Sequence, residues 1–220
     1  MKIRHILLAT TCTAALALGG CASNPTNAQV GTGVGAVVGG VMAVDRRTAG
    51  TQIEDEGIEL RAANRIREAL GDRAHVNVTS YNRQALLTGE VATAQDRQAV
   101  EQMVSQVENV RSVVNDLAVM PPSTLSQRST DTFITGKVRA SLVDAQDISA
   151  NSFKVVTERN TVYLMGRVSQ REANRATDIA RGVTDVRKVV RVFEIVSEEE
   201  LRRIAPQPAP VTTDTKPAGG

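Results

Sequence analysis

The chain has 220 residues, with 26 Lys and Arg against 24 Asp and Glu, which gives a formal net charge of +2. A protein that binds nucleic acid through bulk charge would be much more basic, so we expect no nucleic-acid partner. The chain has no Trp, two Tyr and three Phe, so its cores must be built from Val, Ile, Leu and Ala, and its length suits one or two domains.

Residues 1–20 have the layout of a secretory signal peptide. Lys2 and Arg4 precede an apolar run, rich in Leu and Ala, that extends from Ile6 to Leu18. A permanent membrane-spanning helix needs about 20 apolar residues, so this run is too short to be one. We therefore expect residues 1–20 to be removed from the mature protein.

The signal segment ends at a cysteine. Leu18, Gly19, Gly20 and Cys21 resemble the bacterial lipobox, in which a peptidase cuts before the cysteine and the thiol carries a diacylglycerol. Two or more acyl chains hold a protein stably on a membrane, so lipidation would tether the chain through Cys21. Ala22, not Asp, follows the cysteine. An Asp there resembles an inner-membrane retention signal, so we expect the outer membrane. The alternative is an ordinary signal peptide with an incidental cysteine. Loss of Cys12 with the signal would leave no partner for an intrachain disulfide.

Two segments lack the periodicity of a folded core. Residues 21–54 are expected to form a lipidated, Gly-rich linker. Its segment 31–44 looks like a phosphate-binding loop, but no strand precedes it and no Lys-Ser or Lys-Thr pair follows. Residues 205–220 are rich in Pro and should be disordered.

A unit of about 70 residues occurs twice between these segments. Each copy contains a helical pattern, two strand-like runs joined by a turn, a second amphipathic helix and a closing strand with a Val-Arg-x-Val-Val core. We expect an α+β fold with two tandem domains at residues 55–120 and 126–197, each a three-stranded mixed sheet packed against two helices. Prolines in the segment 120–123 mark the joint. Gly89 and Gly166 should allow helix and sheet to approach closely or supply a bulge.

This pattern resembles the BON domain, named for bacterial osmotic-stress and nodulation proteins. The features that carry the resemblance are the Gly-x-Val of residues 89–91 and 166–168, the amphipathic helix that follows and the closing strand. Together with the lipobox, they resemble the dual-BON-domain outer-membrane lipoproteins. The resemblance implies binding of anionic phospholipids such as phosphatidylglycerol and cardiolipin, maintenance of the outer-membrane barrier and recruitment to division sites.

No arrangement of residues typical of an enzyme is evident. His75 is the only histidine after signal removal and is expected to be a surface residue. No paired His or Cys spacing suits zinc, and the acidic runs 54–56 and 198–200 should be solvated. We therefore expect neither catalysis, a metal nor a cofactor.

The first helix of the second unit contains the candidate site. At about 100° per residue, Ile134, Val138 and Leu142 form one stripe that should be core. Phe133 and Lys137 fall on another side, where an aromatic ring and a cation could meet lipid phosphates. Periodicity alone leaves open whether Phe133 instead folds back onto its own domain.

Charge favours the second unit as the membrane contact. Residues 126–196 carry twelve Lys and Arg against eight Asp and Glu, a net charge of +4, whereas residues 45–119 carry nine against twelve, a net charge of −3. The resemblance assigns lipid contact to this same helix, although Trp is commoner where Phe133 stands. The predicted phospholipid-binding residues are Phe133, Ile134, Lys137, Val138, Arg139, Leu142 and Val143.

We therefore expect a lipid-anchored, non-enzymatic protein on the periplasmic face of the outer membrane that binds anionic phospholipids and helps to maintain envelope integrity. The first unit's corresponding helix, around residues 62–70, has no aromatic residue and many Glu neighbours, so it should not bind lipid. The rival hypothesis is a scaffold that binds envelope-assembly, division or peptidoglycan-remodelling proteins.

Overall fold

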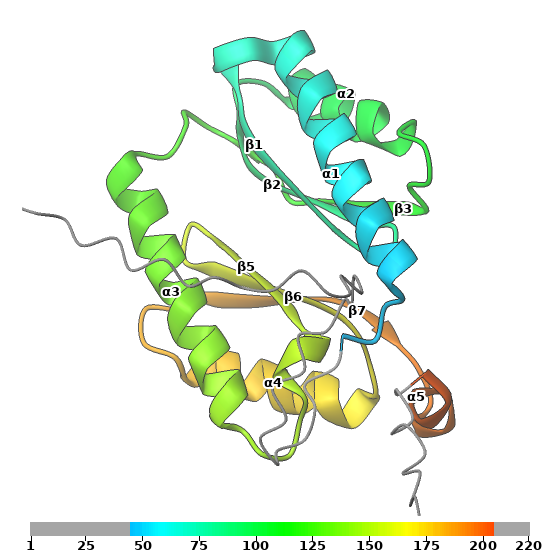
Figure 1. The fold of residues 1–220 in the computed structure, drawn as a ribbon. Helices are drawn as coiled ribbons and strands as arrows, with labels where there is room; N and C mark the ends of the chain where they lie inside the picture. Colours follow the sequence, from blue (N-terminus) through cyan, green and yellow to red (C-terminus); the bar gives the residue numbers. More distant parts are fainter. Residues whose placement is uncertain (1–44, 205–220) are drawn as a thin grey trace, which may run out of the picture. The chain divides into compact units, whose positions relative to one another are not determined.

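The computed structural model describes residues 45–204 (Figure 1), all of which fall in one compact unit. The expected signal peptide, the lipidation site Cys21, most of the linker and the tail 205–220 lie outside the described residues.

The first domain follows the expected order helix–strand–strand–helix–strand. Its helix α1 begins at Ala49, earlier than the expected domain start at residue 55, because Thr48 caps it by accepting a hydrogen bond from the Thr51 N–H. Its elements are α1 (Ala49–Leu70), η1 (Gly71–Arg73), β1 (His75–Tyr81), β2 (Gln84–Val91), α2 (Ala94–Ser105), β3 (Ser112–Asn115) and β4 (Ala118–Val119).

The second domain repeats this order and is followed by a short helix that the sequence analysis did not predict. Its elements are α3 (Leu125–Asp144), η2 (Ala150–Ser152), β5 (Lys154–Glu158), β6 (Thr161–Val168), α4 (Gln170–Gly182), β7 (Lys188–Ile195) and α5 (Glu198–Ile204). The acidic run 198–200, expected to be solvated, forms the first turn of α5, and Glu200 accepts a hydrogen bond from Arg167 at 2.6 Å. Asp and Glu favour the first turn of a helix because they face its positive dipole end.

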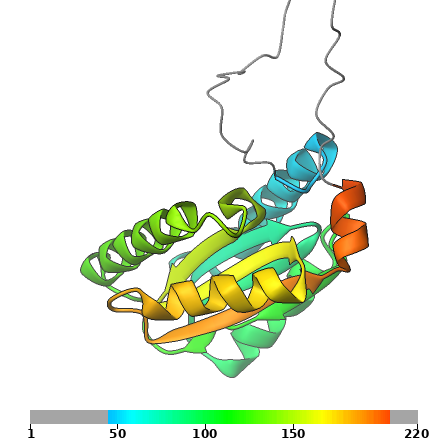
Figure 2. The same cartoon turned by 90° about the horizontal axis from the view of Figure 1, so that it is seen from below.

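Each domain has the mixed sheet that was expected. β2 pairs antiparallel with β1 and parallel with β3, and β6 pairs antiparallel with β5 and parallel with β7. The closing strand of the first domain differs from the expectation because it breaks into β3 and β4, which makes a sheet of four strands. In the second domain α3 and α4 lie side by side over one sheet face (Figures 1 and 2).

The two sheets pack against each other through their other faces. Strand β2 is buried at nearly every residue, which requires cover on both sides. Helices α1 and α2 cover one side, and an apolar cluster shared by both domains covers the other. The buried members of this cluster are Tyr81, Leu86, Tyr163, Met165 and Val192.

A buried aspartate secures the hairpin turn of each domain. The first turn places Asn82 and Arg83 at φ +50° and +64°, so their N–H groups point away from the sheet ladder. The carboxylate of Asp55 accepts both N–H groups at 2.8 Å. The expectation of a solvated acidic run at residues 54–56 is therefore wrong for Asp55, which is 1% exposed. Asp131 has the same role at the second turn, residues 159–160.

Gly89 and Gly166 lie where two backbones come together, but the neighbour is strand β1 at Gly89 and the short 3-10 helix η2 at Gly166, not one of the α-helices that cover the sheet. A Cβ at Gly89, which has φ +110°, would collide with the carbonyl oxygen of His75 on the adjacent strand. A Cβ at Gly166 would collide with the carbonyl oxygen of Ser152 in η2. Both positions therefore require glycine.

Candidate membrane-binding surface

Helix α3 is fixed to the second domain by its caps and its buried stripe. Thr124 and Gln127 form a reciprocal capping box at its start. Ile134, Val138 and Leu142 are essentially fully buried and pack in the second core, as the stripe predicted. These three belonged to the predicted phospholipid-binding set, but a buried side chain cannot touch a bilayer. They hold the helix in place, and any lipid contact falls to the other four residues.

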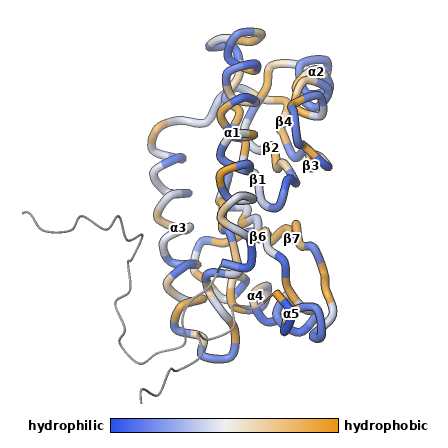
Figure 3. Tube along the Cα trace, turned by 45° about the vertical axis from the view of Figure 1, so that its right-hand side comes forward, coloured by the Kyte–Doolittle hydropathy of each residue, from blue (hydrophilic) through white to orange (hydrophobic). Residues whose placement is uncertain are grey.

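The outer face of α3 carries three exposed apolar side chains along its length. Phe133 is 67% exposed and so is Val143, which settles the open question of whether the Phe133 ring folds back. Leu125, missed by the sequence analysis, is 80% exposed. It lies 18 residues before Val143, which is five full turns, so periodicity places the two on one stripe. Figure 3 shows polar and apolar positions alternating along α3. We call Leu125, Phe133 and Val143 the α3 outer face.

Two cations flank this face, and each also has a partner in the protein. The Lys137 ammonium lies 5.1 Å from the centroid of the Phe133 ring, a cation–π distance. It also donates to the Thr184 carbonyl and to Asp185, both at 2.9 Å, so its charge is partly neutralised. Arg139 donates to the Val155 carbonyl at 3.3 Å and pairs with no carboxylate among residues 45–204.

A cleft of about 470 Å³ opens beside Arg139 and Val143. Its floor is apolar, with Tyr81, Leu142, Phe153 and Val155, and its charged lining consists of Asp45, Arg47, Arg139 and Lys154. Arg47 and Lys154 are held by carboxylates, so Arg139 is the cation there that is available to an external anion. The α3 outer face thus adjoins a site of positive charge.

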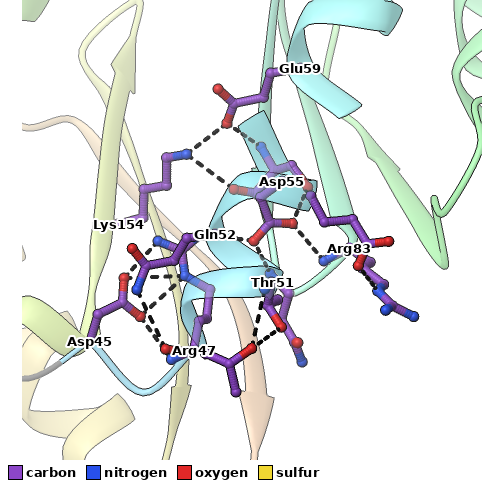
Figure 4. Close-up of polar contacts among 12 residues, drawn as sticks. Asp45, Arg47, Thr51, Gln52, Asp55, Glu59, Arg83 and Lys154 are labelled. Atoms are coloured by element: carbon purple, nitrogen blue, oxygen red, sulfur yellow. Dashed lines mark hydrogen bonds and ion pairs between the residues drawn. The ribbon is translucent and has the colours of Figure 1, made fainter. Parts of the chain in front are cut away.

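The segment that precedes α1 contacts both domains. Arg46 makes a two-pronged contact with Glu172 of α4, at 2.7 and 2.8 Å, which joins the segment to the second domain. Arg47 pairs with Asp45 and with the buried Asp55 of α1 (Figure 4). Lys154 of β5 donates to Glu59 of α1 at 2.6 Å, which joins α1 itself to the second domain.

These ion pairs predict a loss of stability in acid. Burial acts to raise the pKa of Asp55 and of Glu172, but hydrogen bonds from Ser80, Arg83 and Arg47 to Asp55, and from Arg46 to Glu172, outweigh it and lower both values. A carboxyl group with a lowered pKa in the folded state stabilises the fold above its unfolded pKa, about 4. That contribution is lost as pH falls through the folded value.

We therefore expect the free energy of unfolding, measured by urea denaturation, to fall steadily between pH 5 and about pH 2. The variant Glu172→Gln lacks one of these carboxyl groups, so its free energy of unfolding should fall less on acidification than that of the wild-type chain. If the free energy of unfolding fell equally with pH in the two chains, Glu172 would not contribute to the loss of stability in acid.

Helix α1 provides a contrast to α3. Ile53 and Leu60 are also exposed, at 70% and 64%. The exposed Glu56 lies between them, and the helix has no aromatic residue. Across residues 45–204, no helix combines the length and the apolar character that crossing a membrane would require.

His75 is not the free surface residue that was expected. Its Nδ1 lies 3.0 Å from a carboxylate oxygen of Glu90, which is fully buried. Glu158 of the second domain is also buried, and its carboxylate accepts a hydrogen bond from Asn77 at 2.9 Å. Spacing along the chain could not reveal this group, because its members come from three strands and both domains.

Comparison with known proteins agrees with this architecture. A family model described as the BON domain matches residues 58–121 and 130–197. The chain is similar to the outer membrane lipoprotein DolP of Haemophilus influenzae, with 36% identity over 168 residues that cover 73% of this chain and 87% of the relative. It is also similar to a 21 kDa hemolysin of Actinobacillus pleuropneumoniae, with 34% identity over 155 residues that cover 70% of this chain and 80% of the relative.

Among solved structures, CdsD, a structural protein of the type III secretion system of Chlamydia trachomatis, matches 72% of this chain and 99% of its own length with 14% identity and a TM-score of 0.28. The matches to the family model and to the two relatives cover most of the described residues. The chain therefore belongs to the BON-domain family and carries two tandem copies of that domain.

Proposed function

We propose that this protein is an outer-membrane lipoprotein, tethered at the periplasmic face through Cys21, that binds anionic phospholipids through the α3 outer face and supports envelope integrity at division sites. The similarity to the outer membrane lipoprotein DolP supports the class and the location. The proposal assigns no catalytic step to the chain.

The observation that carries the proposal is the exposed Phe133 ring with the Lys137 ammonium beside it. A ring of this kind can enter the boundary between headgroups and acyl chains, while nearby cations face lipid phosphates. Leu125 and Val143 extend the apolar contact along the same helix, which would lie flat on the membrane. Each basic residue near an anionic surface contributes about 1 kcal/mol, within a Debye length.

The anchor and the helix would reinforce each other. A tether at Cys21 confines the chain to the membrane, so the α3 contact becomes intramolecular and can be weak on its own. The anchor would supply attachment, and α3 would supply preference for regions rich in phosphatidylglycerol or cardiolipin.

Replacing Phe133 with Glu should abolish most of this lipid binding. The test uses a chain with Cys21→Ser, which cannot be lipidated, in co-sedimentation with phosphatidylglycerol vesicles. Burying a Phe side chain contributes about 1.5–3 kcal/mol, and 1.4 kcal/mol is a tenfold change in affinity. We therefore expect binding to weaken at least tenfold in Phe133→Glu and to weaken for the parent chain as salt rises.

The matched control is Leu60→Glu, because Leu60 on α1 is almost as exposed as Phe133. It should bind vesicles like the parent chain. The lipid proposal would be overturned if Phe133→Glu bound phosphatidylglycerol vesicles as well as the parent chain does. It would also be overturned if the parent chain bound neutral phosphatidylcholine vesicles as well as phosphatidylglycerol vesicles.

A second candidate function is a scaffold for envelope proteins, favoured by the exposed Ile53 and Leu60 of α1. Apolar side chains among acidic neighbours suit a protein surface better than an anionic membrane. An absence of vesicle binding, together with capture of an envelope-assembly protein that Leu60→Glu abolishes, would favour the scaffold.

A further inference from the structure

The polar cluster between the two sheets has the composition of a metal site. One nitrogen of His75 and one carboxylate oxygen each from Glu90 and Glu158 lie within 4.8 Å of one another. His75 and Glu90 are direct partners in the β1–β2 ladder, and Glu158 ends β5 of the other domain. Both carboxylates are buried.

We propose that His75, Glu90 and Glu158 bind one divalent transition-metal ion, with Zn²⁺ as the representative, which links the two domains. An imidazole nitrogen with carboxylate oxygens is a ligand set that zinc accepts. Zinc–ligand distances of about 2.0–2.2 Å place two tetrahedral ligand atoms about 3.4 Å apart. The His75–Glu90 pair is already that close, so only the Glu158 oxygen has to move inward, by about 1 Å. The proposal does not depend on lipid binding.

The pair formed by His75 and Glu90 has a geometry that an ion could use. The 3.0 Å between His75 Nδ1 and Glu90 Oε2 is bridged by a hydrogen bond, and the metal would take the place of the shared proton. Arg159 donates to the other oxygen of Glu90, Oε1, at 3.0 Å, and to the Gly89 carbonyl at 2.8 Å. The guanidinium therefore occupies the far oxygen, while Oε2 faces the imidazole and also accepts a hydrogen bond from the Ser123 N–H at 3.0 Å.

Glu158 forms no ion pair with a Lys or Arg of residues 45–204. Among the described residues its carboxylate accepts a hydrogen bond from the neutral amide of Asn77. Glu158 is 3% exposed, and a carboxylate oxygen of Glu90 lies within 4.8 Å of its own. A buried carboxylate normally has a paired charge or a metal, so a bound cation would compensate this one.

A second, independent feature is an unpartnered hydroxyl on the same sheet face. Thr88 is fully buried, and its Oγ1 has no hydrogen-bond partner within the described part of the chain. Thr88 lies opposite Asn77 and two residues before Glu90, so all three share one face of the sheet. Buried hydroxyls are normally satisfied, and a water completing the coordination of the metal would satisfy this one.

The site also has an entrance. A cavity of about 370 Å³ is lined by His75, Asn77 and Glu158. The other charged groups on its wall are Arg128 and Asp131; the Asp131 carboxylate is engaged by two backbone N–H groups. An ion could therefore reach the cluster without separation of the domains.

The test is a calorimetric titration of ZnCl₂ into the full chain, prepared in detergent without a histidine tag and stripped with EDTA. We expect one Zn²⁺ per chain, a rise in the urea midpoint and a shift of the His75 imidazole resonances, assigned in a His5→Gln background. His75→Gln and Glu158→Gln should each weaken binding at least tenfold.

The Glu158→Gln variant removes a buried negative charge and keeps the shape of the side chain, so it should fold at least as well as the parent without metal. The control Glu68→Gln alters an exposed acid on α1 and should leave zinc binding unchanged. Absence of zinc binding at millimolar concentration, or binding that survives both ligand substitutions, would overturn the proposal. Vesicle binding by these variants reports separately on the lipid proposal.

Discussion

Replacing Asp55 with Ala is expected to lower the free energy of unfolding by about 3–5 kcal/mol, the range for breaking a buried ion pair. Its carboxylate accepts hydrogen bonds from the Ser80 hydroxyl at 2.6 Å and from Arg47 at 2.8 Å, in addition to the two N–H groups of the hairpin turn. Alanine would leave these donors without their acceptor, and each unsatisfied buried group costs about 1–3 kcal/mol. Urea denaturation followed by circular dichroism measures the change.

The neighbouring Glu56 provides the control, because it is exposed. Glu56→Ala should change stability by less than about 0.5 kcal/mol. Asp131→Ala removes the corresponding carboxylate from the second hairpin. That carboxylate accepts hydrogen bonds from two backbone N–H groups, whereas Asp55 accepts from four donors, so the effect of Asp131→Ala should be smaller. An Asp55→Ala chain as stable as Glu56→Ala would show that the turn does not need its buried acceptor.

Gly89→Ala is expected to destabilise the chain by about 3 kcal/mol or more, at the upper end of single substitutions. The residue combines a left-handed φ of +110° with close approach of the His75 carbonyl, so alanine would incur both backbone strain and a steric clash. The β1–β2 ladder would have to separate at this point. The same denaturation measurement, with the soluble yield of the variant, reports the effect.

Two further glycines make the test specific. Gly166→Ala meets the Ser152 carbonyl without a left-handed φ, so it should cost less than Gly89→Ala. Gly136 lies inside α3 with open space where a Cβ would stand, and Gly136→Ala should stabilise the chain by up to about 1 kcal/mol. If all three substitutions had similar effects, local geometry would not be the cause.

The sequence alone determined the repeat, the order of elements and the core stripe of α3. These features follow from local periodicity: a helix that buries one face must repeat its apolar residues every three to four positions, as Ile134, Val138 and Leu142 do. The same reasoning placed Phe133 off the core stripe and could have found Leu125, five turns before Val143.

The tertiary structure alone decided which polar residues are buried and which surfaces meet. Asp55 reads as one acid in a charged run, yet the turn of residues 82–83 folds over it. The packing of the two sheets brings Glu158 beside His75, although 83 positions separate them in the sequence. Periodicity reports whether a face is buried, but it carries no information about the partner, because that depends on contacts between segments distant in the chain.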